Sequence, residues 1–172
     1  MRLKFEKLFV LSVALTACVT TTWAQAPKKV GEYGDWSAYV FVEGADNKVC
    51  YMVSQPRKEE AKYTQRGDVF ALITHRPAEN SRNVFSYISG YSYKPESEVT
   101  VTVGNQNFIL FTEGESAWTP DQATDNKLTD AIRRGNSFVV KGVSSRGTKT
   151  TDTFGLKGSS AAYKAISEEC GI

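Results

Sequence analysis

Two cysteines, Cys50 and Cys170, lie far apart in this chain of 172 residues, behind a leader with the features of an export signal. An even, widely separated pair of cysteines in an exported protein is more often a disulfide than a metal site or a redox centre. A bridge that closes a loop of ~100 residues can stabilise a fold by up to ~4–5 kcal/mol in the chain-entropy account. The sequence therefore predicts one domain, closed almost end to end by a Cys50–Cys170 disulfide.

Residues 1–24 predict a cleavable signal peptide. A basic start with Arg2 and Lys4 precedes an apolar run over 8–19, which is shorter than the ~20 residues that span a bilayer. Cleavage after Ala24 would make Gln25 the first residue of the mature chain. The mature chain is then expected to lack a transmembrane segment and to reside in the periplasm, at the outer membrane or outside the cell.

A second interpretation of the leader is a lipoprotein signal. Leu15-Thr16-Ala17-Cys18 has small residues directly before a cysteine, so Cys18 would carry the lipid and become the first residue. The protein would then be anchored to the envelope through Cys18, with 20–29 as a tether. Both interpretations exclude the leader from the fold and leave Cys50 and Cys170 to pair with each other.

Charge argues against a nucleic-acid partner. The complete chain has 21 basic and 19 acidic residues, and three of the basic residues and one of the acidic residues belong to 1–24. The mature chain is therefore neutral, without the positive field that attracts nucleic acid or anionic lipid.

From residue 35 onward, short β-type runs alternate with turn signals. The runs are 36–42, 48–54, 69–74, 84–88, 99–103, 108–111, 137–141 and 148–156. The dipeptide Gly104-Asn105 between two of them predicts a tight hairpin. We expect a mainly β fold over 35–172, an antiparallel β-sandwich or barrel-like sheet, with 25–34 as a linker.

Two short helices are expected within this β fold, around 120–134 and 159–170. Thr119 fits an N-cap and Pro120 the first helical position, and Gly135 fits the end of the first helix. In the second helix an apolar or small residue recurs every fourth position up to Cys170, which places this cysteine on the buried face. The disulfide would therefore attach the last helix to the strand that carries Cys50.

Candidate catalytic and metal-binding residues are few. His75 is the only histidine, and no Gly-x-Ser-x-Gly motif accompanies it, so a hydrolase that uses His75 is the weaker interpretation. Asp121, Asp125 and Asp130 lack the glycine and terminal glutamate of a calcium loop and coincide with a helix start, where acidic residues are favourable. We therefore expect no catalytic residue, no bound cofactor and no metal.

Two other patterns have both a functional and a structural interpretation. Arg66-Gly67-Asp68 is a candidate adhesion loop, but such tripeptides recur by chance and the same residues form an ordinary turn before the strand 69–74. Tyr87, Tyr91 and Tyr93 could stack on sugar rings, although alternate aromatic residues in β proteins more often fill the core.

The order of several short motifs resembles the invasion-associated locus B family of Gram-negative bacteria. The resemblance runs from Gly34 to Cys170. Its motifs are Gly34-Asp35-Trp36, Cys50-Tyr51, Ser54-Gln55-Pro56, Arg66-Gly67-Asp68, Thr74-His75-Arg76-Pro77, Gly90-Tyr91, Ala117-Trp118, Ser145-Arg146-Gly147-Thr148, Thr151-Asp152-Thr153, Leu156-Lys157-Gly158, Ala161-Ala162 and Cys170.

This resemblance implies a small, exported, β-rich envelope protein with a paired cysteine, of a kind that in some bacteria is linked to invasion of host cells such as erythrocytes. It provides no catalytic residues. We expect a non-enzymatic protein that binds a protein or envelope component, the host-cell surface included, and contributes to attachment and virulence. The alternative is a periplasmic housekeeping module without a host role.

Overall fold

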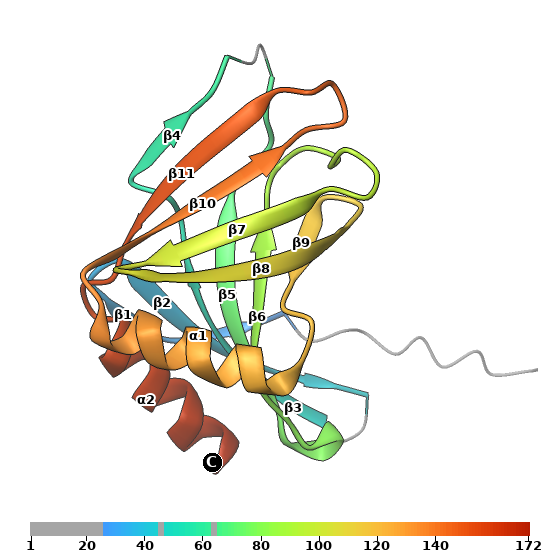
Figure 1. Ribbon diagram of the computed structural model, residues 1–172. Helices are drawn as coiled ribbons and strands as arrows, with labels where there is room; N and C mark the ends of the chain where they lie inside the picture. Colours follow the sequence, from blue (N-terminus) through green and yellow to red (C-terminus); the bar gives the residue numbers. More distant parts are fainter. Residues whose placement is uncertain (1–25, 45–46, 63–64) are drawn as a thin grey trace, which may run out of the picture.

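The computed structural model describes residues 26–44, 47–62 and 65–172, and most of its elements are β-strands (Figure 1). The strands are β1 (Lys28–Tyr33), β2 (Trp36–Glu43), β3 (Asn47–Ser54), β4 (Lys58–Glu60), β5 (Phe70–Arg76), β6 (Ser81–Ile88), β7 (Glu98–Val103), β8 (Gln106–Glu113), β9 (Ser116–Trp118), β10 (Ser137–Val143) and β11 (Lys149–Gly155). The two α-helices are α1 (Gln122–Arg134) and α2 (Ser159–Cys170), and a 3-10 turn follows β5 at Pro77–Glu79.

All eleven strands belong to one antiparallel sheet. Their order is β1-β2-β3-β5-β6-β9-β8-β7-β10-β11-β4, so β1 and β4 are the two edges. Among the described residues these edges are not paired with each other, and the sheet is not closed into a barrel. The prediction of a mainly β antiparallel fold with two short helices is confirmed.

The hairpin around Gly104-Asn105 shows how the sequence pattern becomes structure. Val99 and Val101 are fully buried on one face of β7, and Thr100 and Thr102 alternate with them on the other face. Val103 pairs with Gln106 across a two-residue turn in which Gly104 has a φ of +57°. A positive φ at this position suits glycine, so the predicted hairpin is confirmed.

The sheet bends over itself and encloses an aromatic core. Phe138 of β10 and Phe154 of β11 stack with ring centroids 4.6 Å apart. From β6, Phe85 contacts Phe138 edge-on and Tyr87 contacts Phe154 edge-on. Figure 1 shows β7 and β8 crossing in front of β5 and β6, with β10 and β11 continuing the same layer above them. One curved sheet therefore supplies both layers of a sandwich-like core.

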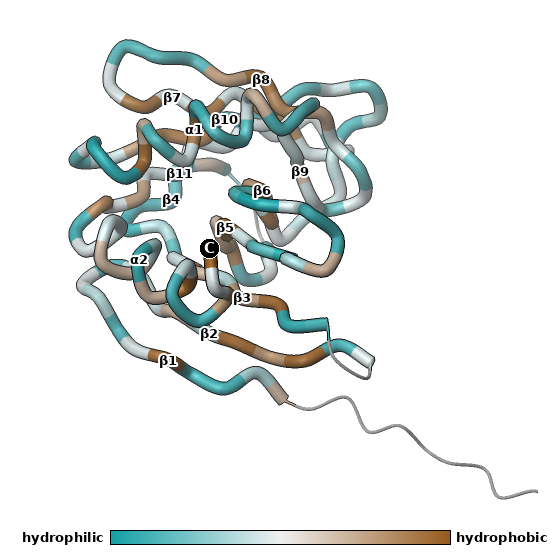
Figure 2. Tube along the Cα trace, turned by 90° about the horizontal axis from the view of Figure 1, so that it is seen from below, coloured by the Kyte–Doolittle hydropathy of each residue, from teal (hydrophilic) through white to brown (hydrophobic). Residues whose placement is uncertain are grey.

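The two helices cover one end of this curved sheet. Helix α1 packs against β6, β7 and β8, and α2 packs against β1, β2, β3 and β5. Leu128 and Ile132 of α1 and Ile166 of α2 have no exposed surface. Figure 2, seen from the helix end, shows α2 lying over β2 and β3. No helix in 26–44, 47–62 or 65–172 has the length and apolar character needed to cross a membrane.

The start of α1 differs from the prediction. Asp121, not Thr119, is the N-cap, and its carboxylate accepts a hydrogen bond of 2.7 Å from the backbone N–H of Thr124. Thr119 instead donates its hydroxyl to the carboxylate of Asp125. A carboxylate at the N-cap also has a favourable interaction with the helix dipole, which explains why the helix begins two residues later than expected.

The segment expected to be a linker contains strand β1. Within 25–34, residues Lys28–Tyr33 pair with β2, and Val30 and Tyr33 pack against the core. Charged, glycine-containing sequences have weak β patterns, and such sequences are common at sheet edges. The three-residue strands β4 and β9 are too short for any periodicity to reveal. Cys18 and the rest of the leader lie outside the described residues.

The disulfide is formed as predicted. Cys50 on β3 is bonded to Cys170 at the end of α2, with their Cα atoms 6.0 Å apart. Both cysteines are buried. The bridge therefore attaches the last helix to the sheet at the end of the molecule that the helices cover.

Candidate functional site

Arg66 lies in the connection between β4 and β5, with its side chain turned into the protein. That side chain is only 3% exposed. Its two terminal nitrogens each donate a hydrogen bond of 2.7 Å to one carboxylate oxygen of Asp152 on β11. Its Nε donates to the carbonyl of Ser89, at 2.6 Å, and Glu59 approaches from the more exposed side. Arg66 is therefore held in a bidentate, charge-assisted pair.

This placement corrects the adhesion-loop hypothesis for Arg66-Gly67-Asp68. A receptor that grips such a tripeptide needs both charges exposed, whereas here only Asp68 is exposed and the guanidinium is enclosed. The reason is the fully buried carboxylate of Asp152, which would be left uncompensated without Arg66. Because Asp152 is distant in sequence, the local tripeptide gave no sign of this partner.

Tyr87 completes the buried polar network. Its hydroxyl donates to the Asp152 carboxylate and receives a hydrogen bond of 3.0 Å from Arg66. Burial, together with the negative charge of Asp152, raises the pKa of Tyr87 far above its usual value of 10. The phenol therefore remains protonated and acts as a donor. Asp152 thus accepts hydrogen bonds from both Arg66 and Tyr87, which allows it to be buried as an anion.

A close backbone contact places Tyr91 beside Arg66. The N–H of Gly67 donates to the carbonyl of Gly90 at 2.8 Å, and Gly90 has a φ of +69°. A Cβ atom on Gly90 would lie 2.3 Å from the oxygen of Gly67, so a side chain does not fit there. The guanidinium carbon of Arg66 lies 5.2 Å from the centroid of the Tyr91 ring, within cation–π range.

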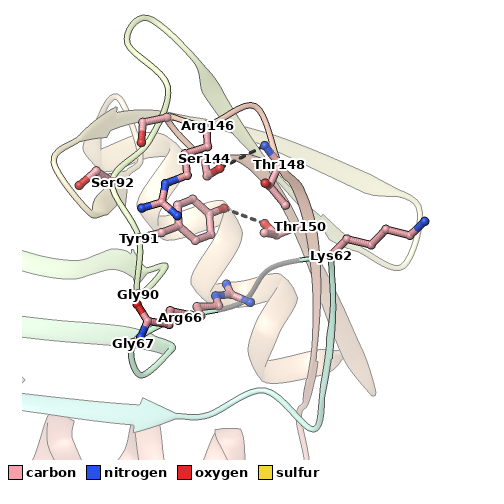
Figure 3. A pocket seen from close by; sticks show the side chains of 12 residues that line it. Lys62, Arg66, Gly67, Gly90, Tyr91, Ser92, Ser144, Arg146, Thr148 and Thr150 are labelled. Carbon is pink, nitrogen blue, oxygen red and sulfur yellow. Dashed lines mark hydrogen bonds between the residues drawn. The ribbon is translucent and has the colours of Figure 1, made fainter.

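A pocket of about 860 Å³ opens above this network, between three loops (Figure 3). We call it the Arg66 pocket. The loops are those after β4, after β6 and between β10 and β11. Its lining consists of Lys62, Gln65, Arg66, Gly67, Gly90, Tyr91, Ser92, Ser144, Ser145, Arg146, Thr148 and Thr150.

The Arg66 pocket combines hydroxyl groups with positive charge. Five of its lining residues are serine or threonine, and none of the described lining residues is acidic. Lys62 and Arg146 are exposed, and within the described part of the chain neither makes an ion pair. Tyr91 is fixed by a hydrogen bond of 2.7 Å between its hydroxyl and that of Thr150. Such a lining suits a hydroxylated, negatively charged ligand.

The three tyrosines considered for sugar stacking divide between core and pocket. Tyr87 and Tyr93 are buried, with 0% and 6% of their surfaces exposed, so both belong to the core. Only Tyr91 lines the pocket, and Tyr93 contacts it edge-on from below the surface. The structural interpretation therefore holds for two of the three, and Tyr91 remains a candidate binding residue.

His75 lies at the opposite end of the molecule, fully buried beneath α2. Its Nδ1 accepts a hydrogen bond of 3.1 Å from the backbone N–H of Asn83, so its proton is on Nε2, which faces the Ser167 hydroxyl at 3.4 Å. A base that activates Ser167 would need a lone pair on Nε2. Burial, and secondarily the charge of Arg82, lowers the pKa of His75 to about 4. The arrangement is that of a structural histidine.

The three aspartates considered for calcium serve the helix and its surroundings. Asp121 caps α1, the buried carboxylate of Asp125 accepts a hydrogen bond from the backbone N–H of Phe85, and Asp130 pairs with Arg133 and Arg134. Across 26–44, 47–62 and 65–172, no three potential metal-ligating side chains come together.

Asp152, Thr150 and Arg146 belong to the site although sequence reasoning did not select them as functional residues. One signal was present, because Asp152 is an acidic residue in a β run whose neighbours alternate between faces. An acidic residue on the inward face of such a strand requires a buried cation. The pattern indicated that a partner was needed but did not identify Arg66.

A family model described as "Invasion associated locus B (IalB) protein" matches residues 36–167. The match covers β2 through most of α2 and includes every described residue of the Arg66 pocket. Neither a curated protein nor a solved structure matches the chain.

Proposed function

The chain belongs to the invasion-associated locus B family, and from this premise we propose that it is an exported, non-enzymatic binding protein of the bacterial envelope that holds its partner in the Arg66 pocket. The leader supports export to the periplasm, the outer membrane or the exterior. If the domain is exposed at the cell surface, the same pocket serves attachment to host cells and their invasion.

The observation that carries this proposal is a concave polar surface on a rigid base. Tyr91 is held by the Arg66 guanidinium, by the Gly67–Gly90 contact and by the Thr150 hydroxyl. Preorganised groups lose little entropy when a ligand binds, so they favour recognition. Lys62 and Arg146 remain available for a ligand.

The chemistry of the pocket supports binding over catalysis. Its hydroxyl groups have no neighbouring histidine, since His75 is buried at the helix end, and its floor carboxylate, Asp152, is occupied by Arg66 and Tyr87. An activated nucleophile requires an adjacent base with a free lone pair. The groups of the Arg66 pocket therefore fit the recognition of a ligand better than its hydrolysis.

The proposal is tested by locating the domain and then measuring pocket-dependent binding. Protease shaving of intact cells and of spheroplasts, with a periplasmic marker as control, reports on exposure. The labelled mature protein is then bound to erythrocytes and to isolated outer membranes. Arg146→Ser removes a pocket charge, whereas Lys149→Ser removes the same charge from the same hairpin at an exposed residue outside the pocket lining.

We expect Arg146→Ser, but not Lys149→Ser, to reduce binding to at least one of the two surfaces. Digestion on intact cells together with erythrocyte binding would support the attachment role. Protection until the outer membrane is breached, together with binding only to the bacterial membranes, would favour the housekeeping module. Equal binding by both variants and the unmodified protein would contradict a role for the pocket.

A further inference from the structure

The size and lining of the Arg66 pocket restrict the chemistry of its ligand. A volume of about 860 Å³ is much larger than an inorganic anion needs and is in the range of sites for small organic ligands. The hydroxyl groups of Ser92, Ser144 and Thr148 can both donate and accept hydrogen bonds. The ligand is therefore expected to carry several hydroxyl groups of its own.

Arg66 is not available as the anion-binding group. Its donors are directed to the Asp152 carboxylate, the Ser89 carbonyl and the Tyr87 hydroxyl. Its role is that of a positioning residue, because it fixes one face of the Tyr91 ring. Of the two exposed cations, Lys62 points away from Tyr91 and Arg146 points toward it (Figure 3), so Arg146 is the group that can meet a negative charge beside the ring.

Arg146 is placed to bind an anion beside an aromatic surface. It lies at the exposed turn between β10 and β11, and Figure 3 shows its side chain directed toward the Tyr91 ring, on the other side from Arg66. A guanidinium binds a carboxylate, sulfate or phosphate through paired hydrogen bonds. An aromatic ring beside hydroxyl groups offers an apolar surface to the face of a sugar.

We infer that the Arg66 pocket binds an acidic saccharide. Tyr91 contacts the sugar ring, the serine and threonine hydroxyls bond to its hydroxyl groups, and Arg146 binds its carboxylate, sulfate or phosphate. This inference rests on the proposed function, in which the same pocket holds the partner. Acidic saccharides of this kind have two sources. One is the sulfated or carboxylated polysaccharides of a host-cell surface, and the other is the phosphorylated sugars of the bacterial outer membrane.

The test uses the mature protein, exported and with its disulfide intact, in NMR titrations that follow backbone amides. Four probes are compared: a heparin-derived sulfated tetrasaccharide, a phosphorylated glucosamine disaccharide, maltotetraose and inorganic sulfate. We expect one or both acidic saccharides to shift the amides of Ser92, Arg146 and Thr148, and to bind at least about tenfold tighter than maltotetraose or sulfate. Preference for the sulfated probe indicates a host source, and preference for the phosphorylated probe a bacterial one.

Matched variants assign the contacts. Arg146→Ser should weaken binding about tenfold, whereas Lys149→Ser should leave it within about twofold. Tyr91→Phe should retain most of the affinity because it keeps the ring, and Tyr91→Leu should lose it. Thermal unfolding of each variant verifies that the fold is intact. Equal binding of maltotetraose, equal binding of sulfate, or equal losses in Arg146→Ser and Lys149→Ser would each overturn the inference.

Failure of this inference can be distinguished from failure of the proposed function. If no saccharide binds but Arg146→Ser still abolishes binding to erythrocytes or outer membranes, the ligand class is wrong and the pocket is still the binding site. If Arg146→Ser changes neither saccharide binding nor membrane and cell binding, both proposals fall.

Discussion

At the helix end of the molecule Cys50 is bonded to Cys170, whereas at the pocket end Arg66 is paired with Asp152. Both connections join segments that are distant in sequence, by 120 residues in the first case and 86 in the second. The covalent connection is surrounded by apolar groups and the neutral His75, and α2 covers it. The ionic connection is surrounded by hydroxyl groups and lies beneath an open pocket.

This difference predicts different roles for the two ends. A disulfide does not need polar surroundings, so the helix end can be sealed as part of the core. A buried ion pair requires oriented donors and acceptors around it, and these same groups hold the floor of the Arg66 pocket. Stability is therefore expected to depend on both ends, and recognition only on the ionic end.

Removing the negative charge at the pocket end should have the largest effect. Asp152→Asn leaves the Arg66 guanidinium buried without its main partner, and we expect a loss of about 3–5 kcal/mol in the free energy of unfolding. Urea unfolding with the disulfide intact measures it. Asp130→Asn, which affects only exposed pairs with Arg133 and Arg134, is the control and should change stability by less than about 0.5 kcal/mol.

The double variant Arg66→Met with Asp152→Leu sharpens this test. Because it removes both buried charges together, it should lower the free energy of unfolding by less than Asp152→Asn does. A double variant as unstable as Asp152→Asn would show that shape, and not the unpaired charge, dominates at this site.

Removing the covalent connection should destabilise the opposite end. Replacing Cys50 and Cys170 together with alanine should lower the free energy of unfolding by about 2–5 kcal/mol, because the unfolded chain regains entropy. Hydrogen exchange should accelerate in α2, while the amides of the Arg66 pocket keep their protection relative to global unfolding. Selective loosening of the pocket would contradict the separation of the two ends.

Acid should weaken the helix end through His75. Its pKa is lowered to about 4 in the folded protein from an ordinary 6.5, so the unfolded chain binds a proton that the folded chain does not. Stability should therefore fall as the pH decreases from 6.5 to 4, by up to about 3 kcal/mol. Urea unfolding at several pH values measures this slope.

His75→Gln is the matched variant for the acid experiment. It cannot take up the proton and should have a flatter pH dependence between 6.5 and 4. Carboxyl groups such as Asp125, whose pKa burial raises, contribute similarly to both proteins and cancel in the comparison. Identical slopes for the two proteins would mean that His75 is not responsible.

Filling the space between two glycines should disturb the pocket end. Gly90→Ala combines a positive φ with a Cβ only 2.3 Å from the oxygen of Gly67. We therefore expect the free energy of unfolding to fall by about 2–3 kcal/mol and ligand binding to weaken. Gly104→Ala has a similar φ but open space around its Cβ. Gly104→Ala should lower the free energy of unfolding by only about 1 kcal/mol and leave ligand binding unchanged. The difference between the two variants therefore measures the steric effect apart from the backbone effect.

The smallest effect on stability is expected at the mouth of the pocket. Arg146→Ser and Lys149→Ser both alter exposed residues of one hairpin and should change the free energy of unfolding by less than about 0.5 kcal/mol. Only Arg146→Ser should reduce binding. A large loss of stability in Arg146→Ser would assign Arg146 to the fold instead of to recognition.

Regular patterns in the sequence predicted most of the fold. The alternation in β7 and the turn at Gly104 specified a hairpin, and the fourfold spacing that ends at Cys170 specified α2. The pattern failed where an element depends on its neighbour. β1 is charged and lies at an edge, so its pairing with β2 determines its conformation. The N-cap of α1 is Asp121 because the Thr119 hydroxyl is bonded to the carboxylate of Asp125.

The sequence by itself determined the β class and the Cys50–Cys170 bridge, because these depend on periodicity and on the number of thiols. Only the tertiary structure decided the meaning of Arg66-Gly67-Asp68. The tripeptide is compatible with an exposed loop until the sheet bends and brings the buried carboxylate of Asp152 next to Arg66. A buried charge must be compensated wherever it lies in the chain, and that requirement, acting across 86 residues, turned the side chain inward and created the floor of the Arg66 pocket.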